Sequence, residues 1–295
     1  MAYRIKDKEA VRKAVRRILR AQLKKAIEGG QQSSQPIDER VHLLRSRLKR
    51  ARAAVDLVHR RAGSGAASDE RWMREVARSL SKARDVAVQA DTLHRLLEQN
   101  PDRMAAGADP SLRDIGSRLR RKMSPTTMEA RVSDVVARLQ KRRRRIGRWP
   151  VHHGRRALRQ GLEAAYRRAR RRMRKACDPT TEQSARAERM HGLRKSIKRL
   201  AMEVAVLRDH APDLSRRLGG PLHELGVLLG EVHDLVVLRQ SLERELGTPR
   251  DRRNRAILFE LIDRRLAEVE SAASAKSQET LALRPKLIRR MLSNV

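Results

Sequence analysis

The chain has 295 residues, and its 70 lysines and arginines against 35 aspartates and glutamates give a formal net charge of +35. Self-repulsion of this size disfavours a compact state unless a partner supplies negative charge, so the balance points to a polyanionic ligand. The single cysteine excludes an internal disulfide. No apolar run approaches the roughly 18 residues of a membrane helix, and we expect a cytoplasmic protein that does not insert into membranes.

The apolar residues predict an all-α protein. They make up 39% of the chain and recur at helical spacing, whereas aromatic residues contribute only 2%. No sustained alternation of β-branched residues predicts a strand. Helices are expected to separate at runs of glycine and proline, among them Gly63 to Gly65, Trp149-Pro150, Asp178-Pro179 and Gly219 to Pro221.

An internal repeat organises the chain. The segment from Glu39 to Arg45 recurs 149 residues later as Glu188 to Arg194. The same offset aligns further pairs without insertion: Lys49-Arg50 with Lys198-Arg199, Val55 with Val204, Leu80 with Leu229, Asp85 with Asp234, Val88 with Val237 and Leu93 with Leu242. This repeat predicts one domain of two similar helical-bundle halves, 1–148 and 149–295, related by a pseudo-two-fold axis.

Each copy of the repeat predicts a helix with a basic row beside its apolar row. In the first copy the apolar row is Val41, Leu44, Leu48, Ala51, Val55 and Val58, and the basic row is His42, Arg45, Lys49 and Arg52. The second copy has Met190, Leu193, Ile197, Leu200, Val204 and Leu207 beside His191, Arg194 and Lys198. Because the two rows differ by about 100° around the helix, the charges are expected at the margin of a groove.

Two other segments carry one-sided basic faces. These are Lys13, Arg16, Arg17, Arg20 and Lys24 near the N-terminus, and Arg167, Arg170, Arg171 and Arg174 in the second half. Arginine donates two hydrogen bonds to adjacent phosphate oxygens, and lysine adds a mobile point charge. A phosphate neighbour favours charged histidine, so His42 and His191 are expected to bind an anion more strongly as pH falls. A merely solvated basic face is the alternative.

Five segments resemble the CHAD domain, a conserved-histidine α-helical domain. They are "VHLLRSRLKRAR" at 41–52, "MHGLRKSIKRL" at 190–200, "LSKARDVAVQADTL" at 80–93, "LGEVHDLVVLRQSL" at 229–242 and "YRRARRRM" at 166–173. The resemblance implies two helical bundles with pseudo-two-fold symmetry that enclose a central basic groove. It also implies binding of inorganic polyphosphate.

The resemblance implies a set of contact residues. They are His42, Arg45, Lys49, Arg50, Arg52, Arg84, Arg167, Arg170, Arg171, His191, Arg194, Lys198 and Arg199, with His233 in the slot that Arg84 fills in the first half. We add Arg16, Arg20 and Arg174 from the basic faces. Ala201-Met202 stands where the family usually has Arg-Tyr, and Ser81 replaces a glycine. The second half is therefore expected to bind less tightly, and Asp85 and Asp234 to orient basic neighbours.

The sequence lacks the motifs of phosphate chemistry. It contains neither a Gly-x-x-x-x-Gly-Lys-Ser/Thr loop nor a Glu-x-Glu-x-Lys pattern. The helical phases of His223, Glu231 and His233 are too scattered for a zinc site. We expect a binding protein without catalytic activity, cofactor or metal.

Two polyanions compete as the expected partner. Inorganic polyphosphate at polyphosphate granules is the first expectation, and sequence-nonspecific binding of nucleic acid is the alternative, because counterion release serves both. Two tryptophans, two tyrosines and one phenylalanine leave almost no platform for stacking of single-stranded bases. A scaffold at acidic membranes and an enzyme of polyphosphate turnover rank below these two.

Overall fold

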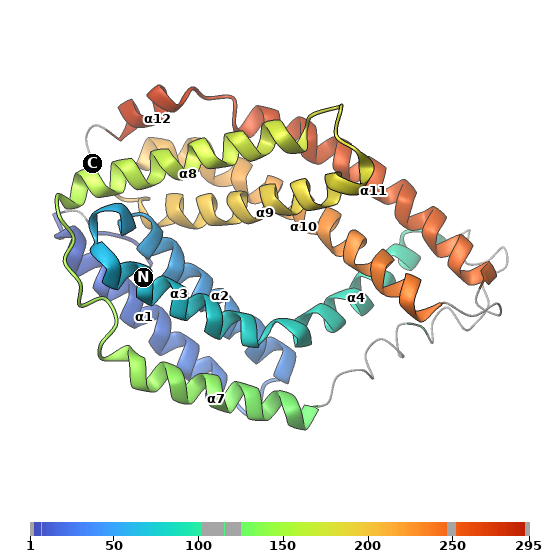
Figure 1. Cartoon of the computed structure of the whole chain (residues 1–295), viewed down its shortest axis with the longest axis horizontal. Coiled ribbons are helices and arrows are strands. Elements are labelled where there is room, and N and C mark those ends of the chain that lie inside the picture. Colours follow the sequence, from blue (N-terminus) through green and yellow to red (C-terminus); the bar gives the residue numbers. More distant parts are fainter. Residues whose placement is uncertain (1–2, 7, 102–114, 116–124, 247–251, 293–295) are drawn as a thin grey trace.

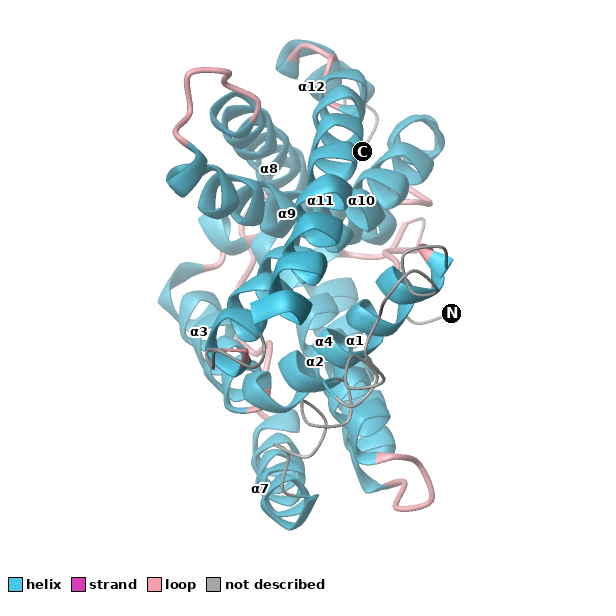
Figure 2. Ribbon diagram, turned by 90° about the vertical axis from the view of Figure 1, so that its right-hand side faces the viewer, coloured by secondary structure: helices cyan, strands magenta, loops and turns pink. Residues whose placement is uncertain are grey.

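The computed structural model describes residues 3–6, 8–101, 115, 125–246 and 252–292, with side chains for all of these except 81–87, 125, 183 and 184. Every regular element in these residues is a helix, which confirms the all-α prediction (Figure 2). The helices are α1 Val11–Gln31, α2 Ile37–Asp56, η1 His59–Arg61, α3 Gly63–Ser79, α4 Ser81–Glu98, α7 Pro125–Arg143, α8 Gly154–Ala176, α9 Gln183–Val206, α10 Pro212–Glu245, α11 Arg252–Thr280 and α12 Pro285–Met291.

The helices form two neighbouring groups. Helices α1, α2, α3 and α7 lie together at the lower left of Figure 1, and α8 to α12 lie above them. Helix α9 contacts α2 where the groups meet, and α4 leaves the first group to pack against α10. Leu93 and Leu96 of α4 join Leu235 and Leu238 of α10 in a separate apolar cluster that also takes in α11.

The apolar rows predicted from the repeat form the main core. On α2, Val41, Leu44 and Leu48 are completely buried. On α9, Leu193 and Ile197 are also completely buried, and they belong to the same cluster. Each fully buried leucine or isoleucine contributes about 1.5 to 3 kcal/mol, so these rows fix both helices and thereby the basic rows beside them.

Two equivalent arginines of the repeat make matching contacts. Arg40 Nη2 donates to the carbonyl of Gly30 at 2.8 Å, near the end of α1. Its repeat counterpart Arg189 donates through Nη1 to the carbonyl of Lys175 at 3.2 Å, near the end of α8. In both copies an arginine thus binds a carbonyl that the end of the preceding helix leaves without an intrahelical donor. The pseudo-two-fold axis and the division at residue 148 stay predictions of the repeat.

The break expected at Gly219 to Pro221 is wrong. Helix α10 continues from Pro212 to Glu245 with Pro221 inside it. The proline removes one backbone hydrogen bond, but Leu218 and Leu222 on either side are at most 3% exposed in the core. Their burial outweighs the local cost. The first half breaks instead between α3 and α4 at Leu80, whose repeat counterpart Leu229 lies inside α10.

Gly161 allows α8 to rest directly on the end of α2. A Cβ atom built on Gly161 would lie 2.1 Å from the backbone oxygen of Leu57. No side chain fits at that distance, so only glycine permits this crossing. The crossing brings α8 next to η1, which follows α2.

Asp69 of α3 is a buried anchor for the segment that joins the two helix groups. One carboxylate oxygen accepts from Arg142 Nη2 at 2.8 Å and from Arg142 Nε at 3.2 Å. The other accepts from the backbone N–H of Gly147 at 3.0 Å and from Trp149 Nε1 at 2.9 Å. Asp69 is 4% exposed, so four donors depend on one carboxylate that water does not reach.

Replacement of Asp69 by alanine is expected to destabilise the protein by about 3 kcal/mol, because it leaves these buried donors without an acceptor. Urea unfolding followed by circular dichroism measures the loss. Glu75→Ala, at an exposed position of the same helix, should change the stability by less than about 0.5 kcal/mol. Equal stabilities of the two variants would contradict the anchoring role.

Candidate functional site

The basic row of α2 borders the core. His42 is exposed, whereas Arg45 and Lys49 are half-buried. Arg45 Nη1 donates to the carbonyl of Ala77 at 2.8 Å, at the end of α3. Arg45 therefore ties α2 to α3 and also adds charge to the row.

Arg50 of α2 lies outside the basic row and packs against Tyr3. Its guanidinium lies 5.6 Å from the centre of the Tyr3 ring. The Tyr3 hydroxyl lies 3.2 Å from the backbone oxygens of both Arg50 and Met202. Tyr3 thus links α2 to α9, and Arg50 packs on that link.

The basic row of α9 meets α10. The rings of His191 and His233 stack with centroids 4.4 Å apart. Arg194 Nη2 lies 3.8 Å from Asp234 Oδ1, the kind of contact expected of a carboxylate that orients a basic neighbour. Gly230 of α10 lies next to the Lys198 amine, since a Cβ atom built on this glycine would be in ordinary contact with the amine at 3.9 Å.

The two stacked histidines are neutral at physiological pH in this structure. Burial is the main cause that lowers the pKa of His191 to about 4, and Lys195 and Arg194 lower it further. Burial also lowers the pKa of His233 to about 3, with Arg194 as the next cause. An anion between these cations would offset their repulsion and raise both pKa values.

Arg52 and Arg199 bind carboxylates where α2, α3 and α9 meet. Arg52 Nη2 pairs with Glu70 Oε1 at 2.7 Å. Arg199 pairs with Asp56 and lies 3.6 Å from Glu203 Oε1. Glu203 is 1% exposed, and burial raises its pKa to about 8. This network joins the two helix groups. Because the carboxylates partly neutralise Arg52 and Arg199, these two arginines attract an anionic ligand less strongly than unpaired arginines would.

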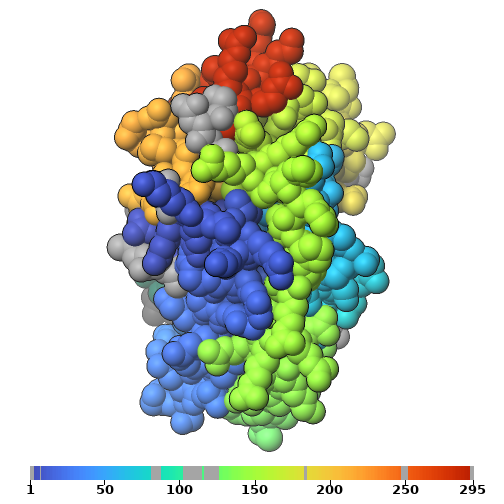
Figure 3. Space-filling model, turned by 90° about the vertical axis from the view of Figure 1, so that its left-hand side faces the viewer, coloured from blue at the N-terminus to red at the C-terminus, as the bar shows by residue number. Residues whose placement is uncertain are grey.

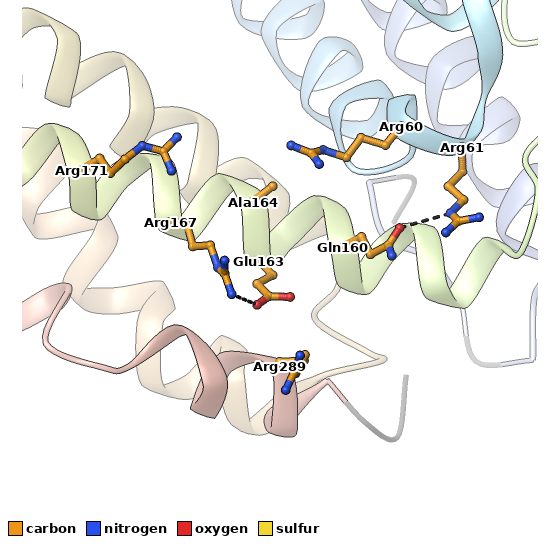
Figure 4. A pocket seen from close by; sticks show the side chains of 8 residues that line it. All are labelled: Arg60, Arg61, Gln160, Glu163, Ala164, Arg167, Arg171 and Arg289. Atoms are coloured by element: carbon orange, nitrogen blue, oxygen red, sulfur yellow. Dashed lines mark hydrogen bonds and ion pairs between the residues drawn. The ribbon is translucent and has the colours of Figure 1, made fainter.

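The arginines of α8 border two adjoining hollows on the side of α12. The larger hollow measures about 690 Å³ and is lined by Arg60, Arg61, Gln160, Glu163, Ala164, Arg167, Arg171 and Arg289 (Figure 4). The smaller measures about 180 Å³ and is lined by Arg167, Arg170, Arg171, Arg174 and Pro285. Neither set of described lining residues includes a member of the basic rows on α2 and α9 or His233 of α10, so the hollows and the basic rows involve different predicted contact residues.

Arg16 and Arg20 belong to a third basic surface. Figure 3 shows α1 beside the segment that joins α7 to α8, and Arg20 Nη2 lies 3.3 Å from the carbonyl of Arg144 in that segment. Repulsion from Arg20 is the largest cause that lowers the pKa of Arg16, and Arg148 adds to it. The positive charges on this face are therefore crowded.

The structure adds residues that the sequence did not single out. Arg60, Arg61 and Arg289 line the larger hollow, but nothing in the sequence distinguishes them among 70 basic residues. The side chain of Arg84, the expected counterpart of His233, lies outside the described residues, as does that of Asp85.

The order of these helices and basic rows along the chain corresponds to a known family. A model of the CHAD domain matches residues 17–243. The chain belongs to the CHAD domain family. No curated protein matches the chain. Residues 17–243 include the basic rows of α2 and α9 and all of α8, whereas α12 lies after the matched residues in the chain.

Two further findings concern membranes and metals. Within the described ranges, no helix combines the length and apolar character needed to cross a membrane. The same residues hold no group of three or more His, Cys, Asp or Glu side chains that could bind a metal ion.

Proposed function

We propose that this CHAD domain protein binds inorganic polyphosphate through the basic rows of α2 and α9 and through His233 of α10. The cluster of His191, Arg194, Lys198 and His233 carries the proposal. It combines half-buried cations with two histidines that burial and neighbouring charges keep neutral. A phosphate chain would supply the negative charge that relieves this repulsion.

The chemistry of the cluster suits linked phosphates. A guanidinium such as that of Arg194 can donate two parallel hydrogen bonds to adjacent phosphate oxygens, and the Lys198 amine would add a point charge. Arg45 and Lys49 present the same residue types on α2. The arginines on α1 and α8 lie outside this cluster, and we assign Arg16, Arg20, Arg167, Arg170, Arg171 and Arg174 to the attraction and outer contact of a long chain. Arg52 and Arg199 hold the two helix groups together beneath the ligand.

The proposal is of a binding protein and not of an enzyme. A phosphotransferase or phosphatase needs metal-binding carboxylates or a loop that cradles phosphates. The buried carboxylates where α2, α3 and α9 meet, Asp56, Glu70 and Glu203, lie against arginines, and Asp234 beside the cluster contacts Arg194.

Polyphosphate is expected to outcompete duplex DNA at equal phosphate concentration and physiological salt. A flexible chain can follow half-buried residues along a helix, whereas a stiff duplex reaches only protruding ones. Displacement of a fluorescent polyphosphate by each competitor measures the ranking, and a second series at higher salt separates bulk charge from specific contacts. Equal or better competition by DNA would favour the nucleic-acid alternative.

A fluorescent fusion of the protein is expected to mark polyphosphate granules in the cytoplasm, because a protein of charge +35 concentrates where its polyanion accumulates. Microscopy with a polyphosphate stain measures the overlap. A diffuse signal in granule-rich cells, or a signal that follows the nucleoid, would contradict this location.

A further inference from the structure

The larger hollow beside α8 is a concave surface with a strong excess of positive charge. Arg60 and Arg61 come from η1, Arg167 and Arg171 from α8, and Arg289 from α12. Glu163 is the one acidic residue among its described lining residues, and it accepts a hydrogen bond from Arg167 Nη2 at 2.7 Å. Five arginines thus face a single carboxylate.

The three elements around the hollow are held in place by hydrogen bonds within the protein. The backbone N–H of His152 donates to the carbonyl of Arg61 at 2.9 Å, which fixes η1 against the segment before α8. The Tyr166 hydroxyl of α8 donates to the carbonyl of Leu283 at 3.1 Å, just before α12. Arg61 Nε also donates to Gln160 Oε1 at 3.2 Å, which joins η1 to α8. The arginines are therefore presented by a scaffold that forms without a ligand.

The directions of the side chains suit an extended anion. Figure 4 shows Arg60 and Arg171 pointing toward one another along α8, with Arg167 and Arg289 on the opposite side of that helix axis in the same view. Arg60, Arg171 and Arg289 are exposed, so their donors are open to a ligand. Each guanidinium can hold one phosphoryl group through two hydrogen bonds.

The size and chemistry of the hollow select the class of ligand. Its volume of about 690 Å³ lies within the range of about 300 to 1,000 Å³ that is typical of small-molecule sites. Such sites are usually lined by apolar side chains, but arginine predominates here, which disfavours a neutral or apolar ligand. Several closely spaced negative charges in a short molecule would match it.

We propose that this hollow is a second anion site, which binds a short chain of linked phosphoryl groups such as tripolyphosphate or the triphosphate of a nucleotide. The site is distinct from the cluster on α9 and α10, although it includes Arg167 and Arg171, which we also assign to the outer contact of a long chain. Arg289 lies outside residues 17–243, so the match to the CHAD domain does not cover the complete site.

Titration calorimetry with tripolyphosphate at physiological salt tests the proposal. Arg60→Gln combined with Arg289→Gln should weaken binding at least about tenfold, since each loses charge-assisted hydrogen bonds to the ligand. The control Arg252→Gln with Arg253→Gln removes the same charge from exposed positions of α11 and should change the affinity less than about twofold. Arg194→Gln with Lys198→Gln should also retain tripolyphosphate binding, whereas its loss of long-chain binding tests the proposed function separately.

A fourth variant tests the sign of the electrostatic effect. Glu163→Gln removes the acidic side chain of the lining and releases Arg167, so it should strengthen tripolyphosphate binding several-fold. Repeating the titration with ATP distinguishes a free oligophosphate from a nucleotide as the preferred ligand, and tighter binding of either supports the site. Equal affinities of the Arg60/Arg289 variant and its control, or a comparable loss in the α9 variant, would overturn the proposal.

Discussion

Replacement of Lys49, Arg194 and Lys198 by glutamine is expected to weaken polyphosphate binding about 100-fold relative to a charge-matched control. Hydrogen bonds to charged groups contribute roughly 1.5 to 3 kcal/mol each before neighbours compensate, so three losses exceed the effect of charge alone. Titration calorimetry at several salt concentrations gives both the affinity and the salt slope.

The control for this variant must avoid structural arginines. Arg142 is unsuitable because it binds Asp69 at 2.8 Å. Arg131→Gln, Lys141→Gln and Arg252→Gln remove three charges at exposed positions of α7 and α11. If long-range charge alone governs binding, both variants will lose the same affinity and the same salt slope. Circular dichroism and thermal unfolding should show that both remain folded, since Arg194 also contacts Asp234.

The core and the position of the basic rows could be predicted because both follow from helical periodicity. Val41, Leu44 and Leu48 recur every three or four residues, and burial of this row places His42 and Arg45 beside it. The repeat then predicted an equivalent helix for His191 and Arg194. Each of these inferences depends on residues that are close in sequence.

Contacts between distant segments could not be predicted in this way. The pairing of Arg199 with Asp56 depends on how α2 crosses α9. The continuity of α10 through Pro221 depends on the core beneath it, which outweighs the local signal. The hollow requires Arg289 of α12 to meet η1. No local pattern contains this information, because these partners are far apart in the sequence and meet only through packing.

The burial and stacking of His191 and His233 could not be predicted from the sequence. The sequence indicated that His191 gains charge near an anion, but the extent of burial and the contact with His233 come from the packing of α9 on α10. Both pKa values lie below the ordinary value of 6.5 in the ligand-free protein. At the proposed anion site, protonation of the two histidines is therefore disfavoured in the ligand-free protein.

Polyphosphate binding is accordingly expected to take up protons and to strengthen about tenfold between pH 7.5 and pH 5.5. Between about pH 6.5 and pH 4, the unfolded chain protonates these histidines and the ligand-free folded protein does not. The stability of the free protein is then fully present above pH 6.5 and falls as the pH decreases through this window. The bound phosphate chain raises both pKa values toward or above 6.5, so the complex gains protons that the free protein lacks, and affinity rises as pH falls.

Calorimetry in two buffers of different ionisation enthalpy measures the proton uptake directly. His191→Gln with His233→Gln should abolish most of the uptake and flatten the pH dependence of affinity, while His152→Gln with His223→Gln, at exposed positions, should preserve both. The comparison separates these two histidines from the remaining seven of the chain and from protonation of the phosphate chain itself, which is common to all variants. Equal proton uptake in the wild type and the His191/His233 variant would show that the stacked pair does not respond to the ligand, since a group whose pKa is unchanged by binding contributes no linkage.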